Sequence, residues 1–156
     1  MIIWFKFHTP RWAFIQWLSV LERFATKDRL VSWGIQVNPT CVFVLGRVWS
    51  AILFHNGIIS GSLVLQNVLN WTKQFHKGNA MVHTILKLSL AATIYWLWRE
   101  RNSRVFQNRS QDCSSLQGVI IDDVRACISS WRGVKASPQN SDIAASRKIS
   151  GKIFLP

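Results

Sequence analysis

Asp122 and Asp123 are the adjacent side chains in this sequence that come closest to a catalytic pattern. Paired aspartates after apolar residues occur in two-metal sites, where carboxylates from separate strands hold two divalent cations. Here the apolar residues around the pair recur every 3.6 residues, which is typical of a helix. The chain has only 7 acidic residues, and the others, such as Glu22, Asp28 and Glu100, are scattered. We therefore predict that Asp122 and Asp123 form a solvated helix face.

Histidine and cysteine do not form a recognisable site either. The four histidines, at 8, 55, 76 and 83, and the three cysteines, at 41, 113 and 127, are never together at metal-ligand spacing. The sequence also has no Ser/His/Asp or Cys/His arrangement and no glycine-rich phosphate loop. This pattern predicts a chain that is not a working enzyme. The odd number of widely spaced cysteines argues against a disulfide framework and favours a reducing, intracellular setting.

The basic side chains carry a stronger signal. The chain has 19 lysines and arginines and a net charge of +12, which favours polyanions such as nucleic acid or an anionic membrane surface. The candidate nucleic-acid-binding residues are Arg99, Arg101, Arg104 and Arg109, followed by Lys73 and Lys77. Guanidinium groups suit phosphate geometry, and Trp96 or Trp98 could stack on unpaired bases. The alternative is that these charges only solubilise the end of an apolar helix whose tryptophans belong to the core.

The arginine cluster follows a predicted central helix over residues 81–106. Residues 88–98 are apolar nearly all round the helix, which indicates a buried element rather than a half-exposed one. The continuation over residues 99–104 should emerge into solvent. The apolar run has 11 residues, whereas a membrane-spanning helix needs about 20. We therefore predict no transmembrane segment.

Two further helices should accompany the central one. Apolar residues at helical spacing predict a helix over residues 12–24, with Pro10 in its first turn. A last helix should begin after a cap, Ser110 or Asp112, and stop at Gly133. The apolar face of the first helix should consist of Phe14, Trp17, Leu18, Leu21 and Phe24. The apolar face of the last helix should consist of Leu116, Ile120, Val124, Cys127 or Ile128, and Trp131.

The predicted fold class is mainly α: a small irregular helical domain with a central buried helix. We expect a short N-terminal strand over residues 2–7 and a disordered tail over residues 134–156, where polar residues dominate. The chain has nine tryptophans, which must be buried or held against a partner, because large exposed apolar patches are poorly tolerated.

Several strings of the sequence, in order, resemble the plant reverse transcriptase zinc-binding domain of LINE-type retrotransposons without terminal repeats. The first strings are Phe5–Pro10, Ala13–Leu18, Ala25–Leu30, Ser32–Gly34 and Pro39–Cys41. The later ones are Arg47–Trp49, Tyr95–Asn102 and Asp123–Ala126. The resemblance divides the chain into a domain remnant over 1–55, a loop and weak helix over 56–80, a helical region over 81–133 and the tail over 134–156.

The zinc ligands of that family are incomplete in this chain. The family pattern is Cys-x2-Cys, a short acidic stretch and His-x4-Cys, followed by an apolar helix near a Val-Trp pair. Cys41 matches the first ligand, but Val44 occupies the second position, and Val48-Trp49 follows at once. One thiolate cannot hold structural zinc. We predict that the zinc of the family is lost here and that the chain needs no other cofactor.

The resemblance implies an ancestral role in binding template nucleic acid, RNA or DNA, beside a reverse transcriptase. We therefore expect a non-catalytic, element-derived fragment, either a decayed copy or a mis-spliced gene model, with an intracellular location and the nucleus as the expected compartment. The first alternative is a helical protein that associates with itself or with a partner through its tryptophan-rich faces. The second is a peripheral membrane protein that uses the helix over 88–104, although its apolar girth fits a core better.

Overall fold

The computed structural model describes residues 3–21, 23, 48, 50–52, 54 and 81–154. The elements are α1 (Pro10–Val20), α5 (Met81–Gln107), α6 (Cys113–Ser129), α7 (Pro138–Ser146) and a short 3-10 helix, η2 (Gly151–Phe154). The prediction of a mainly helical fold is confirmed. Within these residues there is no strand, and no helix is long and apolar enough to cross a bilayer.

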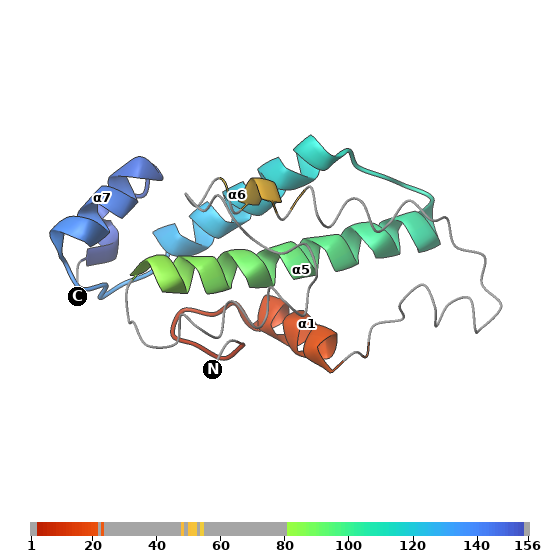
Figure 1. Ribbon diagram of the computed structural model, residues 1–156, viewed down its shortest axis with the longest axis horizontal. Coiled ribbons are helices and arrows are strands. Elements are labelled where there is room, and N and C mark those ends of the chain that lie inside the picture. The colour runs from red at the N-terminus through yellow and green to blue at the C-terminus, as the bar shows by residue number, and fades with distance from the viewer. Residues whose placement is uncertain are drawn as a thin grey trace.

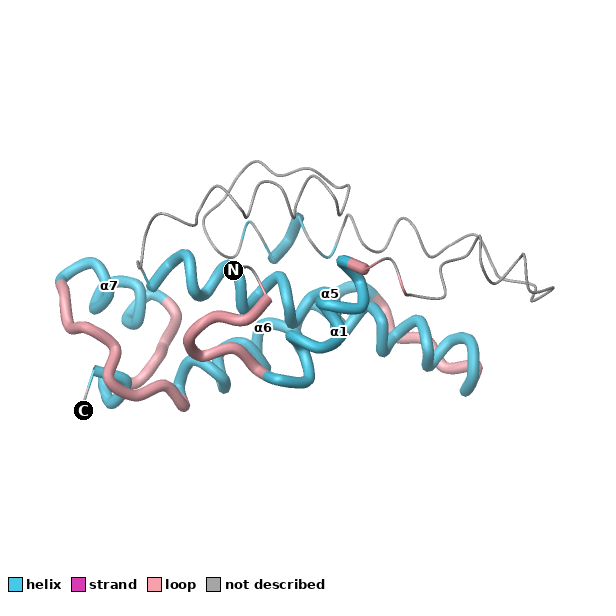
Figure 2. The backbone as a smooth tube through the Cα atoms, turned by 90° about the horizontal axis from the view of Figure 1, so that it is seen from below, coloured by secondary structure: helices cyan, strands magenta, loops and turns pink. Residues whose placement is uncertain are grey.

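The long helix α5 is the centre of the structure, and α1 and α6 both pack against it (Figure 1). Every residue from Leu88 to Ile94 is buried, which includes the polar Ser89 and Thr93. Thr93 Oγ1 donates to the Ser89 carbonyl oxygen at 2.7 Å, so its hydroxyl is satisfied inside the helix. The predicted central buried helix over 81–106 is confirmed. The tube in Figure 2 shows α7 near one end of this bundle, away from the C-terminal end of α5.

Helix α6 has the start and the apolar face that its sequence predicts. Asp112 is the N-cap, and its carboxylate accepts from the Ser115 amide at 2.9 Å. The predicted face is confirmed, since it is buried: its members are Leu116, Ile120, Val124 and Ile128, with Trp131 just beyond the helix. The Trp131 ring stacks on Phe7 with 4.7 Å between ring centroids, which joins the end of α6 to the N-terminal segment.

The Asp112 cap makes the stability of α6 depend on pH. The hydroxyls of Ser114 and Ser115, together with the Ser115 amide, hold the pKa of Asp112 well below its ordinary value. The pKa of Asp112 is lower in the folded state than in the unfolded chain. The charged carboxylate therefore stabilises the fold fully at pH values above the ordinary pKa of aspartate, and this stabilisation is lost as pH falls through the pKa of the folded state. We expect Asp112→Ala to lower the thermal midpoint at pH 7 and to lower it progressively less on acidification. Asp122→Ala, on the same helix, is the control; an equal effect of Asp112→Ala at all pH values would contradict the cap.

Helix α1 begins near the predicted start, but it ends at Val20, before the predicted end at residue 24, and it presents a different face. Pro10 occupies the first turn, as expected. The buried residues are Trp12, Ala13, Ile15, Gln16 and Ser19. The predicted face is wrong, because Phe14 and Leu21 are 49% and 43% exposed and Trp17 is also exposed; Leu18 alone is partly buried against the core. Phe24 lies outside the described residues. Burying Trp12 and Ile15 turns the other aromatic residues outward, because residues three or four apart share a helix face.

Two predictions about the chain ends are also wrong. The described part of the expected N-terminal strand, residues 3–7, forms bends and a turn, and Phe7 has a left-handed φ of 71°. The expected disordered tail forms α7 and η2 instead. Three scattered apolar residues hold it to the core: Ala144, Ile149 and Ile153 are all buried. The Val134 amide also donates to the Ile153 carbonyl oxygen at 3.0 Å. The loop and weak helix predicted over 56–80 lie outside the described residues.

Candidate nucleic-acid interface

Helix α5 ends at Gln107, and a connecting segment leads from it to α6 (Figure 1). Residues of the last turns of α5 and of this segment line a groove of about 700 Å³. This volume falls within the range of small-ligand sites, roughly 300–1,000 Å³. Its aromatic and basic lining residues are Trp96, Trp98, Phe106, Arg99 and Arg109. Its other lining residues are Glu100, Asn102, Ser103, Gln107, Ser110 and Gln111. The groove therefore combines two guanidinium groups, three aromatic rings, several uncharged hydrogen-bonding side chains and one carboxylate, that of Glu100, which pairs with Arg104.

Trp96 is fixed from both its edge and its face. Its indole Nε1 donates to Asp123 Oδ2 at 2.9 Å, which ties α5 to α6. The guanidinium carbon of Arg99 lies over the same ring, 4.7 Å from its centroid, as in a cation–π contact. Arg99 is exposed, so its N–H groups remain open to an anionic ligand. Trp96 is thus a platform for Arg99 rather than an open surface for a base.

Phe106 and Trp98 are the aromatic rings available to a ligand. Phe106 is 80% exposed, which is unusual for a phenylalanine. Trp98 is partly buried and packs against Tyr95, with 6.1 Å between ring centroids. Phe106 lies seven residues after Arg99, two turns along α5, so the two share a helix face. Phe106, Arg99 and Arg109 line the same groove, so an exposed ring suited to stacking and guanidinium groups suited to phosphate occur there together.

Arg104 has a different environment from Arg99 and Arg109. Its Nε donates to Glu100 Oε1 at 2.7 Å, and its terminal nitrogen donates to the Gln111 carbonyl oxygen at 3.1 Å. Glu100 also accepts from the Gln111 amide at 2.9 Å. The prediction that residues 99–104 emerge into solvent is wrong for Glu100, which is only 6% exposed because it anchors the connection to α6. These contacts make Arg104 part of the scaffold behind the groove.

Of the remaining candidate residues, the structure describes Arg101 alone. Arg101 lies on α5 and is half-buried, but it is not among the residues that line the groove. Lys73 and Lys77 lie outside the described residues, as does Cys41. Sequence reasoning missed Phe106 and the polar lining residues. Their signal was spacing: Arg99, Ser103 and Phe106 follow one another at intervals of four and three residues, which places them on one helix face.

The aspartate pair divides into two different environments. The side chain of Asp122 is 72% exposed and pairs with Arg125 at 2.8 Å, as expected for a solvated helix face. Asp123 is less exposed, at 31%, and pairs with Arg11 at 3.5 Å besides accepting from Trp96. The prediction of a solvated face therefore holds for Asp122, whereas Asp123 links α1, α5 and α6.

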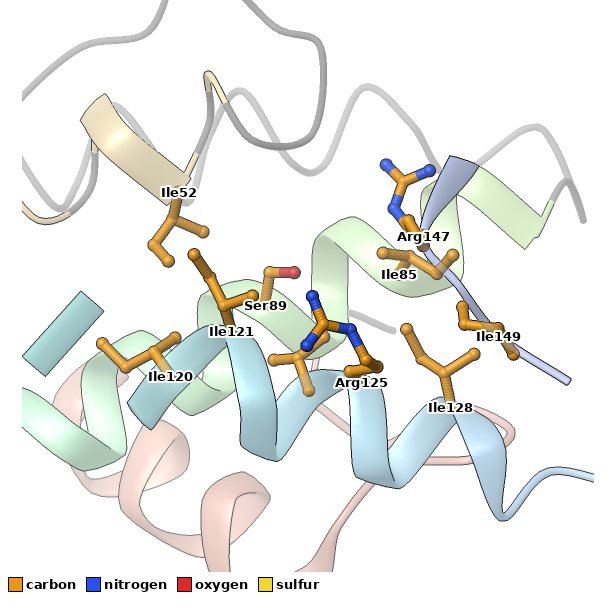
Figure 3. Close-up of a pocket in the computed structure, with 10 residues that line it drawn as sticks. Ile52, Ile85, Ser89, Ile120, Ile121, Arg125, Ile128, Arg147 and Ile149 are labelled. Atoms are coloured by element: carbon orange, nitrogen blue, oxygen red, sulfur yellow. The ribbon is translucent and has the colours of Figure 1, made fainter. Parts of the chain in front are cut away.

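A second cavity is lined mainly by isoleucines, which come from α5, α6 and the segment after α7 as well as from Ile52 (Figure 3). Its polar lining residues are Ser89, Arg125 and Arg147. Its volume is about 20 Å³, which is enough for roughly one water molecule. Burial lowers the pKa of Arg147 from its ordinary value. This cavity is too small for a nucleotide or a lipid chain.

The described residues do not fit the zinc implied by the resemblance. No group of three histidine, cysteine or acidic side chains gathers within the part of the chain that the structure describes. His8 Nδ1 lies 2.8 Å from the Phe5 carbonyl oxygen, and Cys127 Sγ lies 3.2 Å from the Thr9 hydroxyl. Because Cys41 lies outside these residues, the loss of zinc stays a prediction that rests on the sequence.

Comparison with known proteins agrees with the resemblance in the N-terminal region. No curated protein and no solved structure matches the chain. A known protein family does match part of the chain. That family is a domain associated with reverse transcriptase, and the match does not extend to the catalytic polymerase domain. It covers 56 of the 156 residues, so the likeness expected for the later strings remains a prediction. Residues 1–56 match the family described as zinc-binding in reverse transcriptase, which confirms the relationship predicted from the N-terminal motifs.

Proposed function

We propose that this chain is a non-catalytic fragment of a plant LINE-type retrotransposon protein that binds single-stranded nucleic acid in the groove at the end of α5. The observation that carries the proposal is the convergence of Arg99 and Arg109 with Trp98 and Phe106 around one groove. The relationship of residues 1–56 to a domain of reverse transcriptases supports nucleic acid as the ligand. We assign a smaller contribution, to the overall electrostatic attraction of nucleic acid, to Arg101, Arg104, Lys73 and Lys77.

Charge supplies the attraction and the aromatic rings supply the preference for single strands. A net charge of +12 draws any polyanion, and phosphate contacts by arginine release counterions from the nucleic acid. A duplex hides the faces of its bases, whereas an unpaired base can stack on an exposed ring such as Phe106. The groove therefore favours unpaired nucleotides over a duplex of equal charge.

The test is oligonucleotide binding, measured by fluorescence anisotropy across a salt series. We expect single-stranded RNA or DNA to bind with an affinity that falls steeply as salt rises. Arg99→Gln and Arg109→Gln should each weaken binding roughly tenfold and make the salt slope shallower by about one. Lys135→Gln, which removes one exposed charge outside the groove, is the matched control and should have little effect. Equal losses in all three variants would show that only net charge matters and would overturn the proposal.

A further arm of the same experiment tests stacking. Phe106→Ala should weaken single-strand binding by roughly tenfold, since a stacked base contributes about 1–3 kcal/mol. It should leave duplex binding and thermal stability nearly unchanged, because the ring is 80% exposed. An equal effect on single strands and on duplex would contradict base stacking.

The predicted loss of zinc has its own measurement. We expect elemental analysis of the purified protein to find zinc well below one equivalent, because Cys41 has no second ligand at the family spacing. A strong chelator should change neither the far-ultraviolet circular dichroism nor oligonucleotide binding. Stoichiometric zinc, or unfolding by the chelator, would show that other residues complete the site.

A second candidate function, self-association or protein binding, is favoured by the outer side of the N-terminal region. Trp4, Phe14, Trp17, Val20 and Leu21 are all exposed apolar side chains. Phe14 and Trp17 lie side by side, with 5.9 Å between ring centroids, and exposed apolar side chains in contact are typical of interaction sites. Light scattering after size exclusion separates the candidates: a monomer that binds oligonucleotides supports the groove, whereas a dimer that Trp17→Gln dissociates supports association through α1.

A further inference from the structure

Four side chains from three helices form one chain of contacts that ends at the proposed groove. Arg11 on α1 pairs with Asp123 on α6 at 3.5 Å. Asp123 accepts from Trp96 on α5 at 2.9 Å. The Trp96 ring lies beneath the Arg99 guanidinium at 4.7 Å. We infer that Asp123 and Trp96 are positioning residues, which hold Arg99 in the orientation that receives a phosphate; this inference rests on the proposed function.

The role of the Asp123–Trp96 hydrogen bond follows from the geometry of an indole. The Nε1–H group lies at the edge of the ring, so fixing this edge to α6 restricts rotation of the side chain about its bonds to the helix. The face of the ring is then presented at a constant angle. A guanidinium that rests on this face keeps its N–H groups at its edge free, and phosphate oxygens are recognised by those groups.

Asp123 has an unfavourable charge for a phosphate site, and this makes its role testable. On charge alone, removing a carboxylate near a nucleic-acid groove should tighten binding. Arg11 offsets the carboxylate charge and also lies over the Tyr95 ring, 5.4 Å from its centroid. If Asp123 positions Trp96, removing its acceptor oxygen should weaken binding even though the net charge becomes more positive.

The experiment measures single-strand affinity for Asp123→Ala, Asp123→Asn and Trp96→Phe in the full chain. Asp123→Ala removes the acceptor and should weaken binding about fivefold. Asp123→Asn keeps an oxygen that accepts from Nε1 and should bind at least as tightly as the unmodified protein. Trp96→Phe keeps a ring beneath Arg99 but has no N–H group, and it should lose about as much affinity as Asp123→Ala. If Asp123→Ala binds as tightly as Asp123→Asn, the inference is overturned.

A double-mutant comparison separates positioning from a general structural effect. In an Arg99→Gln background, Trp96→Phe and Asp123→Ala should cause no further loss of affinity, because they act through Arg99. A further fivefold loss in that background would assign them a structural role and overturn the inference. If Arg99→Gln itself has no effect, the proposed function fails. If Arg99→Gln weakens binding and neither Asp123→Ala nor Trp96→Phe does, only the positioning fails. Circular dichroism and thermal unfolding of each variant confirm that the fold is retained.

Discussion

Replacing Glu100 with alanine is expected to lower the free energy of unfolding by about 3 kcal/mol. Removing one partner of a buried ion pair costs roughly 3–5 kcal/mol. The Glu100 side chain is 6% exposed, and its carboxylate accepts from Arg104 and from the Gln111 amide. In Glu100→Ala, the Arg104 guanidinium and the Gln111 amide both lose this carboxylate acceptor. We place the effect at the lower end because the Arg104 side chain is 29% exposed and can recover water.

Two matched variants show where the effect of Glu100 arises. Glu100→Gln retains an oxygen acceptor and should cost about 1 kcal/mol, since the hydrogen bonds lose their charge assistance. Arg104→Gln should cost about 3 kcal/mol, because it leaves the Glu100 carboxylate, which is 6% exposed, without its counter-charge. Urea unfolding at constant m-value gives these differences. A loss below about 1 kcal/mol for Glu100→Ala would contradict the assignment of Glu100 as an anchor.

The Glu100 anchor also connects stability to the proposed site. It holds the Gln111 backbone beside α5, and Arg109, Ser110 and Gln111 line the groove. The chain leaves α5 through Asn108, which has a left-handed φ of 50°, a conformation that asparagine tolerates better than most residues. Glu100→Ala should therefore weaken oligonucleotide binding as well as folding, whereas Arg109→Gln should affect binding alone.

The sequence was most informative where a helix has a cap and a single apolar face. For α6, the sequence left Ser110 and Asp112 as possible caps and the structure has Asp112; the predicted buried stripe of Leu116, Ile120 and Ile128 is confirmed. For α5, an apolar run without a polar face correctly predicted a central position, since only a helix covered on several sides buries such a run.

The sequence-based predictions failed for two kinds of segment. One is a helix with apolar residues on several faces, and the other is a segment with few apolar residues. Helix α1 has apolar residues on more than one side, so periodicity could not show that Trp12 and Ile15 face the core while Phe14 and Trp17 do not. The tail has too few apolar residues to signal a helix, yet Ile149 and Ile153 become buried through contact with distant parts of the chain.

The candidate site was foreseen in its location and not in its detail. The spacing of arginines located the end of α5, and Arg99 and Arg109 do line one groove. Spacing could not show that Arg104 is held by Glu100, because both the pairing and the burial depend on Gln111, which lies in another segment. The contacts of Asp123 were equally hidden, since Arg11 is 112 residues away in the sequence.

Helix α1 buries a row of polar groups that have no hydrogen-bond partner within the described structure. These are Trp12 Nε1, both polar atoms of the Gln16 carboxamide, and Ser19 Oγ. Gln16 is completely buried. A buried polar group without a partner costs about 1–3 kcal/mol relative to an apolar group of the same shape. Gln16 is thus the described side chain whose replacement should stabilise the protein most.

Gln16→Met is accordingly expected to raise the free energy of unfolding by about 2 kcal/mol. Methionine has nearly the volume of glutamine and a flexible thioether that adapts to the same space. Gln139→Met, at an exposed position of α7, is the control and should change stability by less than about 0.5 kcal/mol. Urea denaturation of both variants makes the comparison. A loss of stability in Gln16→Met would mean that the carboxamide is hydrogen-bonded in the folded protein. A gain in stability would show that burying the Gln16 side chain lowers the free energy of unfolding, while Phe14 and Trp17 remain exposed on the other face of α1.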